Sequence, residues 1–149
     1  MSEKRILVSA CLLGWRCRYD GATKIDRNLI SGAKAENRSL VPACPEVLGG
    51  LGVPRQPAAI IGGDGHAVLK GKARVLDAQG MDVSKAFILG ADRTLDIARR
   101  TSCSLAILKE DSPSCGACFI KDVKGNKRKG MGVTAALLSS QNISIESHS

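Results

Sequence analysis

The residues of this sequence that could carry chemistry are cysteines placed just after short apolar runs. Three such runs, at residues 6–10, 40–43 and 105–108, each precede a cysteine: Cys11, Cys44 and Cys115, the last after a Ser-Pro-Ser turn. Short apolar runs bounded by turn residues predict buried strands. Ligands bind at the carboxyl ends of the strands in an open parallel sheet. We therefore expect the three thiols to meet at one point.

The thiols allow several interpretations. Cys115 and Cys118 have the spacing of a redox dithiol or of half a zinc site, but Pro113 and Gly116 indicate an extended turn rather than the helix start of a thioredoxin-like motif. A structural zinc site usually offers two close pairs, and Cys44 stands alone. Three isolated thiolates suit an iron–sulfur cluster with an incomplete ligand set, since four cysteines usually hold such clusters. One iron would then stay open as a Lewis acid.

Size and composition favour one globular domain. The chain has 149 residues, of which 24% are charged and 44% hydrophobic, so residues 1–149 are expected to form a single domain. The apolar stretch before Cys11 has about five residues, fewer than the roughly 7–15 of a signal peptide. No run approaches the roughly 18 apolar residues of a membrane span. We expect a cytoplasmic protein without a membrane partner, in which clustered cysteines bind metal or react rather than form disulfides.

The charge balance points to an anionic partner without identifying it. A formal net charge of +8 favours a nucleotide or nucleic acid, and a solvated basic surface explains it equally well. Aromatic residues make up only 3% of the chain, which leaves few stacking platforms for single-stranded nucleic acid. A nucleic acid partner is therefore possible but not favoured, and the sequence gives no indication of the oligomeric state.

The elements that must position the cysteines follow from hydrophobic periodicity. Strands are expected at residues 5–10, 39–43 and 105–108, with a possible edge strand at 143–145, and helices at 28–36, 83–101 and 133–141. Residues 49–65 are expected to form a loop, and residues 67–70 and 73–76 to form a β-hairpin. The helix at 83–101 leads directly into a strand, which gives a crossover unit. The predicted fold is α/β, a single-domain, Rossmann-like three-layer sandwich with a mainly parallel sheet.

Several sequence blocks, taken together, resemble the thiouracil desulfidase family. They lie at residues 9–14 (Ser-Ala-Cys-Leu-Leu-Gly), 17–21, 44–51, 108–116 and 132–138. The resemblance implies an oxygen-sensitive 4Fe-4S cluster held by three cysteines, matched here by Cys11, Cys44 and Cys115. It also implies hydrolytic removal of sulfur from a thiolated pyrimidine, a base or nucleotide of the 2-thiouracil or 4-thiouracil/4-thiouridine type. The products would be the oxo-base and hydrogen sulfide.

Two polar residues near the expected ligands are candidates for catalysis. Water needs a proton acceptor within hydrogen-bond reach, about 2.6–3.2 Å, when it attacks the ring carbon. Glu46, two residues after Cys44, is the predicted base, although it could instead pair with an arginine such as Arg55. Ser112, three residues before Cys115, could orient the water or the ring, or could simply bond the turn backbone.

Other interpretations stay open at this stage. The main alternative is a non-catalytic iron–sulfur or zinc-binding protein that binds a thiolated nucleotide or tRNA. Glu46 and Ser112 favour an enzyme, because a carrier needs no acid–base groups. Cys17 and Cys118 are expected not to be ligands, and Tyr19 and Asp20 are candidates for the pocket wall.

Overall fold

A four-stranded parallel sheet with strand order β2-β1-β5-β8 forms the centre of the structure, a computed structural model that describes residues 4–148. Its strands are β1 (Lys4–Ser9), β2 (Arg38–Ala43), β5 (Leu105–Lys109) and β8 (Ser144–His148). The last four residues of β1 are buried, as expected for a strand with both faces covered. The predicted domain also includes residues 1–3 and 149, which lie outside the described residues.

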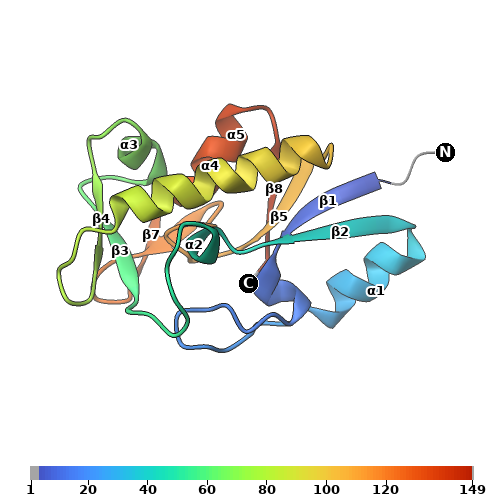
Figure 1. Ribbon diagram of the computed structural model, residues 1–149, viewed down its shortest axis with the longest axis horizontal. Helices are drawn as coiled ribbons and strands as arrows, with labels where there is room; N and C mark the ends of the chain where they lie inside the picture. Colours follow the sequence, from blue (N-terminus) through green and yellow to red (C-terminus); the bar gives the residue numbers. More distant parts are fainter. Residues whose placement is uncertain (1–3, 149) are drawn as a thin grey trace.

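Helices cover both faces of this sheet (Figure 1). On one face, Leu29 of α1 (Arg27–Ala35) packs against the cluster that contains Ile6 and Val8 of β1. On the other face, α4 (Ser84–Arg100) and α5 (Val133–Ser140) pack against the cluster that contains Leu7 and Leu108. The ends of all three helices differ from the predicted ends by at most one residue. The predicted three-layer α/β sandwich is confirmed.

Smaller elements surround the carboxyl edge of the sheet. They are the 3-10 helix η1 (Ala10–Leu13), the short helices α2 (Pro45–Leu48) and α3 (Gly65–Leu69), and two antiparallel strand pairs, β3 (Ala58–Ile61) with β4 (Arg74–Asp77) and β6 (Phe119–Lys121) with β7 (Lys127–Lys129). A third apolar cluster, containing Phe87, Val75 and Ile120, joins these strand pairs to α4. No helix within residues 4–148 combines the length and apolar character needed to cross a membrane.

Two predicted elements are wrong. Residues 49–65 are not all loop, because they include β3, which pairs with β4. Residues 67–70 do not form the first strand of a hairpin, because residues 65–69 form α3. Asp64 explains the difference: its Oδ1 accepts hydrogen bonds from the backbone N–H groups of His66 and Ala67, which caps a helix at this point. A run as short as residues 67–70 fits a strand or a helix, so the cap determines which one forms.

Parallel pairing brings the carboxyl ends of three strands to one place. Ser9 at the end of β1 lies beside Ala43 at the end of β2, and Val8 lies beside Ile107 of β5. The Ser9 hydroxyl also accepts a hydrogen bond of 2.9 Å from the backbone N–H of Lys109. These ends meet near the middle of Figure 1, where β1 continues into η1 and β2 into α2.

Two glycines set the position of α2. A Cβ atom on Gly90 of α4 would overlap the carbonyl oxygen of Pro45, and a Cβ atom on Gly49 would overlap that of Ala86. The backbones of α2 and α4 can therefore approach closely only because both positions lack a side chain. This contact fixes the helix that directly follows Cys44.

Glu110 holds the segment that follows β5. Its Oε1 atom accepts hydrogen bonds from the backbone N–H groups of Ala117, Cys118 and Phe119 at 2.9, 3.0 and 3.0 Å. Burial alone would raise the pKa of this carboxyl, but the N–H donors outweigh burial, and the pKa lies below its ordinary value of 4.5. The carboxylate thus closes the turn that contains Cys115.

Replacing Glu110 with Gln should destabilise the apo protein by about 1 kcal/mol at neutral pH, because charge-assisted bonds become neutral ones on a partly exposed group. The folded-state pKa is lowered, so this stabilisation is present above the ordinary pKa of 4.5 and is lost as the pH falls through the folded-state value. Urea unfolding of both proteins at neutral and acidic pH measures the difference. Glu146→Gln, at an exposed position of β8, is the matched control. An equal difference at both pH values would contradict this account.

Candidate functional site

A cavity of about 620 Å³ opens at the carboxyl edge of the sheet. Its wall comes from the end of β1, η1, the loop after η1, α2, the segment after β5 and the tip of the β6–β7 hairpin. In the described part of the chain, four of the six cysteines line it: Cys11, Cys17, Cys44 and Cys115. The structure thus brings together the three predicted ligands and adds a fourth thiol.

Cys11 lies in η1, the first turn after β1, and is buried. Its carbonyl oxygen accepts hydrogen bonds from the backbone N–H of Lys24 at 3.0 Å and from the Thr23 hydroxyl at 2.8 Å. These bonds fold the following loop back over the cavity. Burial raises the pKa of the Cys11 thiol, and the negative charge of Cys44 raises it further. Cys11 and Cys44 are therefore close enough to repel each other when both are ionised.

Cys44 directly follows β2 and begins α2. In its protonated form its Sγ donates a hydrogen bond of 3.7 Å to the carbonyl oxygen of Cys17. In its ionised form it accepts one from the Cys17 thiol, which lowers the pKa of Cys44 and raises the pKa of Cys17. The negative charge of this pair therefore resides on Cys44, and a thiolate is the form that binds metal.

Cys115 is buried in the turn after β5. The Ser112 hydroxyl oxygen accepts hydrogen bonds from the backbone N–H groups of Ser114 and Cys115, each of 3.1 Å, which fixes this turn. Burial raises the pKa of the Cys115 thiol; the Ser9 hydroxyl opposes that rise, and Cys11 and Cys44 add to it. The three predicted ligands thus act on one another electrostatically.

The donor set fits an iron–sulfur cluster better than a single metal ion. Within residues 4–148, no group of three or more Cys, His, Asp or Glu side chains lies close enough together to hold one ion. A structural zinc ion needs four ligands at about 2.0–2.3 Å. A cluster takes one thiolate at each iron, so it suits thiols spread around a cavity. Positive charge that could balance the thiolates of a cluster lies nearby, since Arg18 and Lys109 both lower the pKa of Cys11.

Glu46 lines the cavity from the first turn of α2. The arginine partner considered from the sequence is present: Nε and Nη2 of Arg55 both lie 3.0 Å from Oε2 of Glu46. Neither contact uses Oε1. Arg55 also donates its backbone N–H to the carbonyl oxygen of Tyr19 at 2.7 Å, so the ion pair links α2 to the loop that contains Cys17.

Ser112 also lines the cavity. The turn bonds considered as its alternative role are present, because its oxygen accepts from two backbone N–H groups. A serine hydroxyl carries one proton and two acceptor lone pairs. Both lone pairs are used here, which makes the hydroxyl proton available for donation to a molecule in the cavity.

The structure places only some of the other candidate residues in the cavity wall. Tyr19 lines the cavity, whereas Asp20 is not part of the wall, and its Oδ1 accepts a turn hydrogen bond of 2.9 Å from the backbone N–H of Ala22. Cys118 is exposed and lines a separate, more open hollow of about 540 Å³. Cys103 is buried in the apolar cluster that contains Leu7 and lies outside the cavity wall.

Sequence reasoning missed several residues of the cavity wall. They include three basic residues and one acidic residue: Arg18, Lys24, Lys109 and Asp111. Asp111 has a left-handed backbone conformation with φ of 69°, and its Oδ1 is buried without a hydrogen-bond partner among the described residues. A lysine at a strand end and isolated basic residues in a loop carry no distinctive spacing. The tip of the β6–β7 hairpin was also missed, because both strands have only three residues and β7 is entirely basic.

Comparisons with known proteins agree on one family. A family model described as 2-thiouracil desulfurase matches residues 6–149. The uncharacterized protein YbbK of Bacillus subtilis is 49% identical over 138 residues, which cover 89% of this chain and 88% of YbbK. The solved structure of the 4Fe-4S-dependent thiouracil desulfidase TudS superposes with a TM-score of 0.83 at 38% identity, over 98% of this chain and 91% of TudS. The chain belongs to the 2-thiouracil desulfurase family.

Proposed function

We propose that this protein is a 4Fe-4S-dependent desulfidase that removes sulfur from a thiolated pyrimidine by hydrolysis and releases hydrogen sulfide. The substrate is a small molecule of the 2-thiouracil or 4-thiouracil/4-thiouridine type, either a free base or a nucleotide. The activity belongs to one domain that spans the chain. Its six free cysteines suit the reducing conditions of the cytoplasm.

One observation supports this function above the others: three thiols from three separate segments share a cavity with a carboxylate and a hydroxyl. Cys11, Cys44 and Cys115 would hold the cluster. When bound, a cluster with three protein ligands supplies one open iron, a Lewis acid that suits a soft sulfur atom. Family membership and the likeness to TudS support the same cofactor.

Glu46 is the proposed base for the attacking water. Arg55 holds its Oε2 atom, which orients the carboxylate, and Oε1 is the oxygen that accepts the proton. The water oxygen then forms its bond to the ring carbon that carries sulfur. Ser112 donates its hydroxyl proton in a hydrogen bond to the water or to the ring, while its two acceptor bonds keep the oxygen in place.

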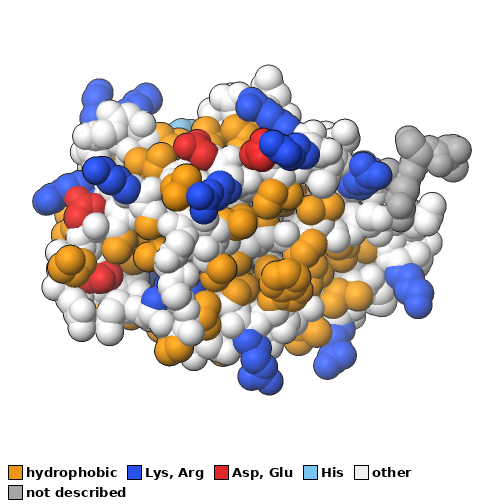
Figure 2. Space-filling model, in the orientation of Figure 1, with side chains coloured by type: hydrophobic (Ala, Val, Ile, Leu, Met, Phe, Trp, Pro, Cys, Tyr) orange, Lys and Arg blue, Asp and Glu red, His pale blue; other side chains and the backbone are white. Residues whose placement is uncertain are grey.

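The face of the molecule drawn in Figure 2 shows no continuous basic surface among the described residues. Lys and Arg side chains lie at separate places along its edge and over its upper half, and hydrophobic side chains gather near its centre. Binding to RNA would need phosphate contacts along a continuous basic surface. We therefore assign the cavity to a small molecule.

Anaerobic reconstitution with iron and sulfide, followed by assay, tests the proposed function. The loaded protein is offered 2-thiouracil, 4-thiouracil and 4-thiouridine compounds, and sulfide and oxo-base are measured together. Hydrolysis predicts that the two products appear in equal amounts without an added reductant or oxidant. Loaded protein that releases no sulfide from any of them would support an iron–sulfur carrier instead.

Replacing Cys11, Cys44 or Cys115 with Ala should each abolish cluster assembly and sulfide release, because each variant removes one of three ligands. Iron and acid-labile sulfide per protein chain measure the first effect, and the desulfidation assay measures the second. Cys118→Ala is the matched control, since this exposed thiol lies outside the cavity wall, and should keep both properties.

Cys17→Ala distinguishes three ligands from four. Cys17 lines the same cavity but bonds to Cys44, so the variant should still assemble a cluster. Complete loss of iron from Cys17→Ala would overturn the three-ligand assignment and make Cys17 a ligand, and a retained cluster in the Cys11, Cys44 or Cys115 variant would remove that residue from the ligand set.

Replacing Glu46 with Gln should leave the iron content unchanged and lower kcat by about 10²–10⁴-fold, the usual contribution of a positioned base. Arg55→Met is the companion variant, because it removes the ion pair and keeps the carboxylate. It should cost far less activity than Glu46→Gln. If both variants lose activity equally, Glu46 serves only as the partner of Arg55.

A further inference from the structure

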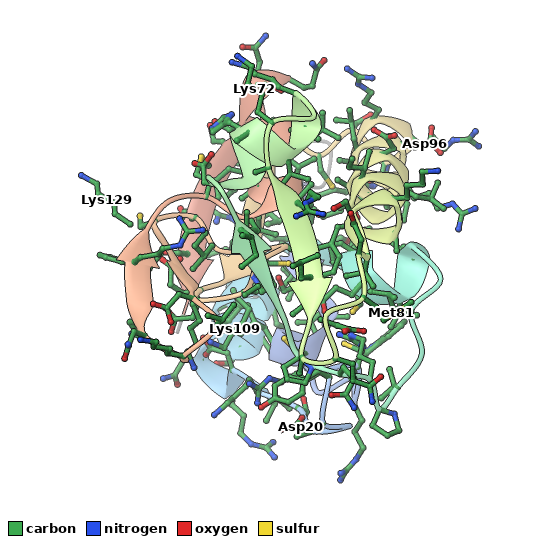
Figure 3. All side chains as sticks on the ribbon, turned by 90° about the vertical axis from the view of Figure 1, so that its left-hand side faces the viewer. Asp20, Lys72, Met81, Asp96, Lys109 and Lys129 are labelled. Atoms are coloured by element: carbon green, nitrogen blue, oxygen red, sulfur yellow. The ribbon has the colours of Figure 1, made fainter. Side chains whose placement is uncertain are left out.

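Lys109 lines the cavity and has no role in the proposed attack of water on the ring carbon. It is the last residue of β5, and the hydrogen bond from its backbone N–H to the Ser9 hydroxyl fixes it beside the end of β1. Its side chain is half-buried and lines the cavity. In Figure 3, Lys109 lies within the outline of the molecule, whereas Lys129 extends from it.

Among residues 4–148, the Lys109 ammonium group contacts a backbone carbonyl and no carboxylate. Its Nζ donates a hydrogen bond of 3.1 Å to the carbonyl oxygen of Glu110, which leaves two N–H donors. Within residues 4–148, no carboxylate lies within 4.0 Å of it. Asp111, whose negative charge raises the pKa of Lys109, pairs with Lys127 at 3.3 Å. A partly buried charge without a partner is costly, and such groups cluster at functional sites.

The groups around Lys109 act in opposite directions on its acidity. Burial, the largest influence, lowers the pKa of Lys109, as do the charges of Arg18 and Lys24. The charges of Asp111 and Cys11 raise it. The net result is a pKa below the ordinary value of 10.5, so this ammonium gives up a proton more readily than a solvated lysine. The mutual influence of Lys109 and Cys11 also places the ammonium near Cys11, one of the three proposed cluster ligands.

Hydrolytic desulfidation needs a proton donor as well as a base. Water loses two protons as its oxygen becomes the ring carbonyl, and sulfur gains two protons to leave as hydrogen sulfide. Glu46 accepts the first proton from water. Neither Glu46 nor Ser112 is assigned to deliver a proton to sulfur. A donor is needed, because sulfur without a proton is a poor leaving group.

We propose that Lys109 donates a proton from Nζ to the departing sulfur atom. The inference rests on the proposed function. As the carbon–sulfur bond breaks, its electron pair goes to sulfur, and the Nζ–H proton passes to the same atom. As the ring carbonyl forms, the hydroxyl group that water left on carbon gives its remaining proton to the neutral amine. The proton held by Glu46 passes through water to the hydrosulfide ion, which leaves as hydrogen sulfide. The two protons of water end on sulfide, and no oxidant or reductant is involved.

The other basic residues of the cavity wall are less suited to this role. Among the described residues, four lysines line the cavity, and Lys24, Lys121 and Lys124 are exposed. Arg55 already pairs with Glu46. An arginine such as Arg18 keeps its proton in a protein, because its pKa exceeds 12.

Three substitutions of Lys109 test the inference, with rates expressed per assembled cluster. Lys109→Met should lower kcat for 2-thiouracil by about 100-fold, the lower end for a positioned acid, while KM changes less than about twofold. Lys109→Arg should not restore kcat, although it keeps the charge. Methylammonium or ethylammonium ions should restore part of the activity of Lys109→Ala. Lys34→Met, at an exposed position of α1, is the charge control and should behave like wild type.

The possible results separate the two proposals. Wild-type kcat in Lys109→Met, or full recovery in Lys109→Arg, would overturn the role of proton donor, and the second result would assign Lys109 a purely electrostatic effect. Loss of iron in Lys109→Met, with normal kcat for the clusters that remain, would also overturn it. Wild-type protein that carries a cluster and releases no sulfide would overturn the proposed function itself.

Discussion

The parallel pairing of β1 with β2 and β5 is the constraint on which the rest of the structure depends. It places three carboxyl ends at one edge, so segments separated by tens of residues form the wall of one cavity. β1 is buried on both faces, and a slip of one residue would exchange the side chains on those faces. The hydrogen bond between the Lys109 N–H and the Ser9 hydroxyl extends this pairing beyond the last backbone bridge. The positions of Cys11 and Cys115 follow from it.

The fold could be predicted from the sequence where long apolar patterns decide the structure. The helix of residues 84–100 has a continuous apolar stripe, and the strands of the sheet are short apolar runs that only a buried environment suits. Residues 67–70 were mistaken for a strand because one side-chain cap, at Asp64, outweighs the pattern of a four-residue run. The β6–β7 pair could not be predicted, since each strand has three residues, β7 consists of Lys and Arg, and the buried Ile120 of β6 packs in a tertiary cluster.

From the sequence, only the site residues that lie next to a strand end could be placed together. In a parallel sheet, cysteines that follow the carboxyl ends of neighbouring strands lie at the same edge. This is why Cys11, Cys44 and Cys115 could be grouped. Glu46 and Ser112 are near in sequence to two of these cysteines and share the cavity with them. Cys17, Arg18 and Lys109 depend on the path of a loop and on side-chain direction. The path of this loop depends on the hydrogen bonds that Thr23 and Lys24 donate to the carbonyl oxygen of Cys11. The spacing of residues in the sequence does not predict these bonds.

The cavity also gives a local reason for part of the basic character of the chain. Three thiolates brought together repel one another, and burial adds to the cost, as the raised pKa values of Cys11 and Cys115 show. Nearby positive charge is the simplest compensation, and Arg18 and Lys109 supply it at Cys11. Binding of a metal group would remove the remaining repulsion, because ligation replaces the proton on each thiol and couples metal affinity to folding. A positive wall is therefore what a buried three-thiolate site requires, whether or not its substrate is charged.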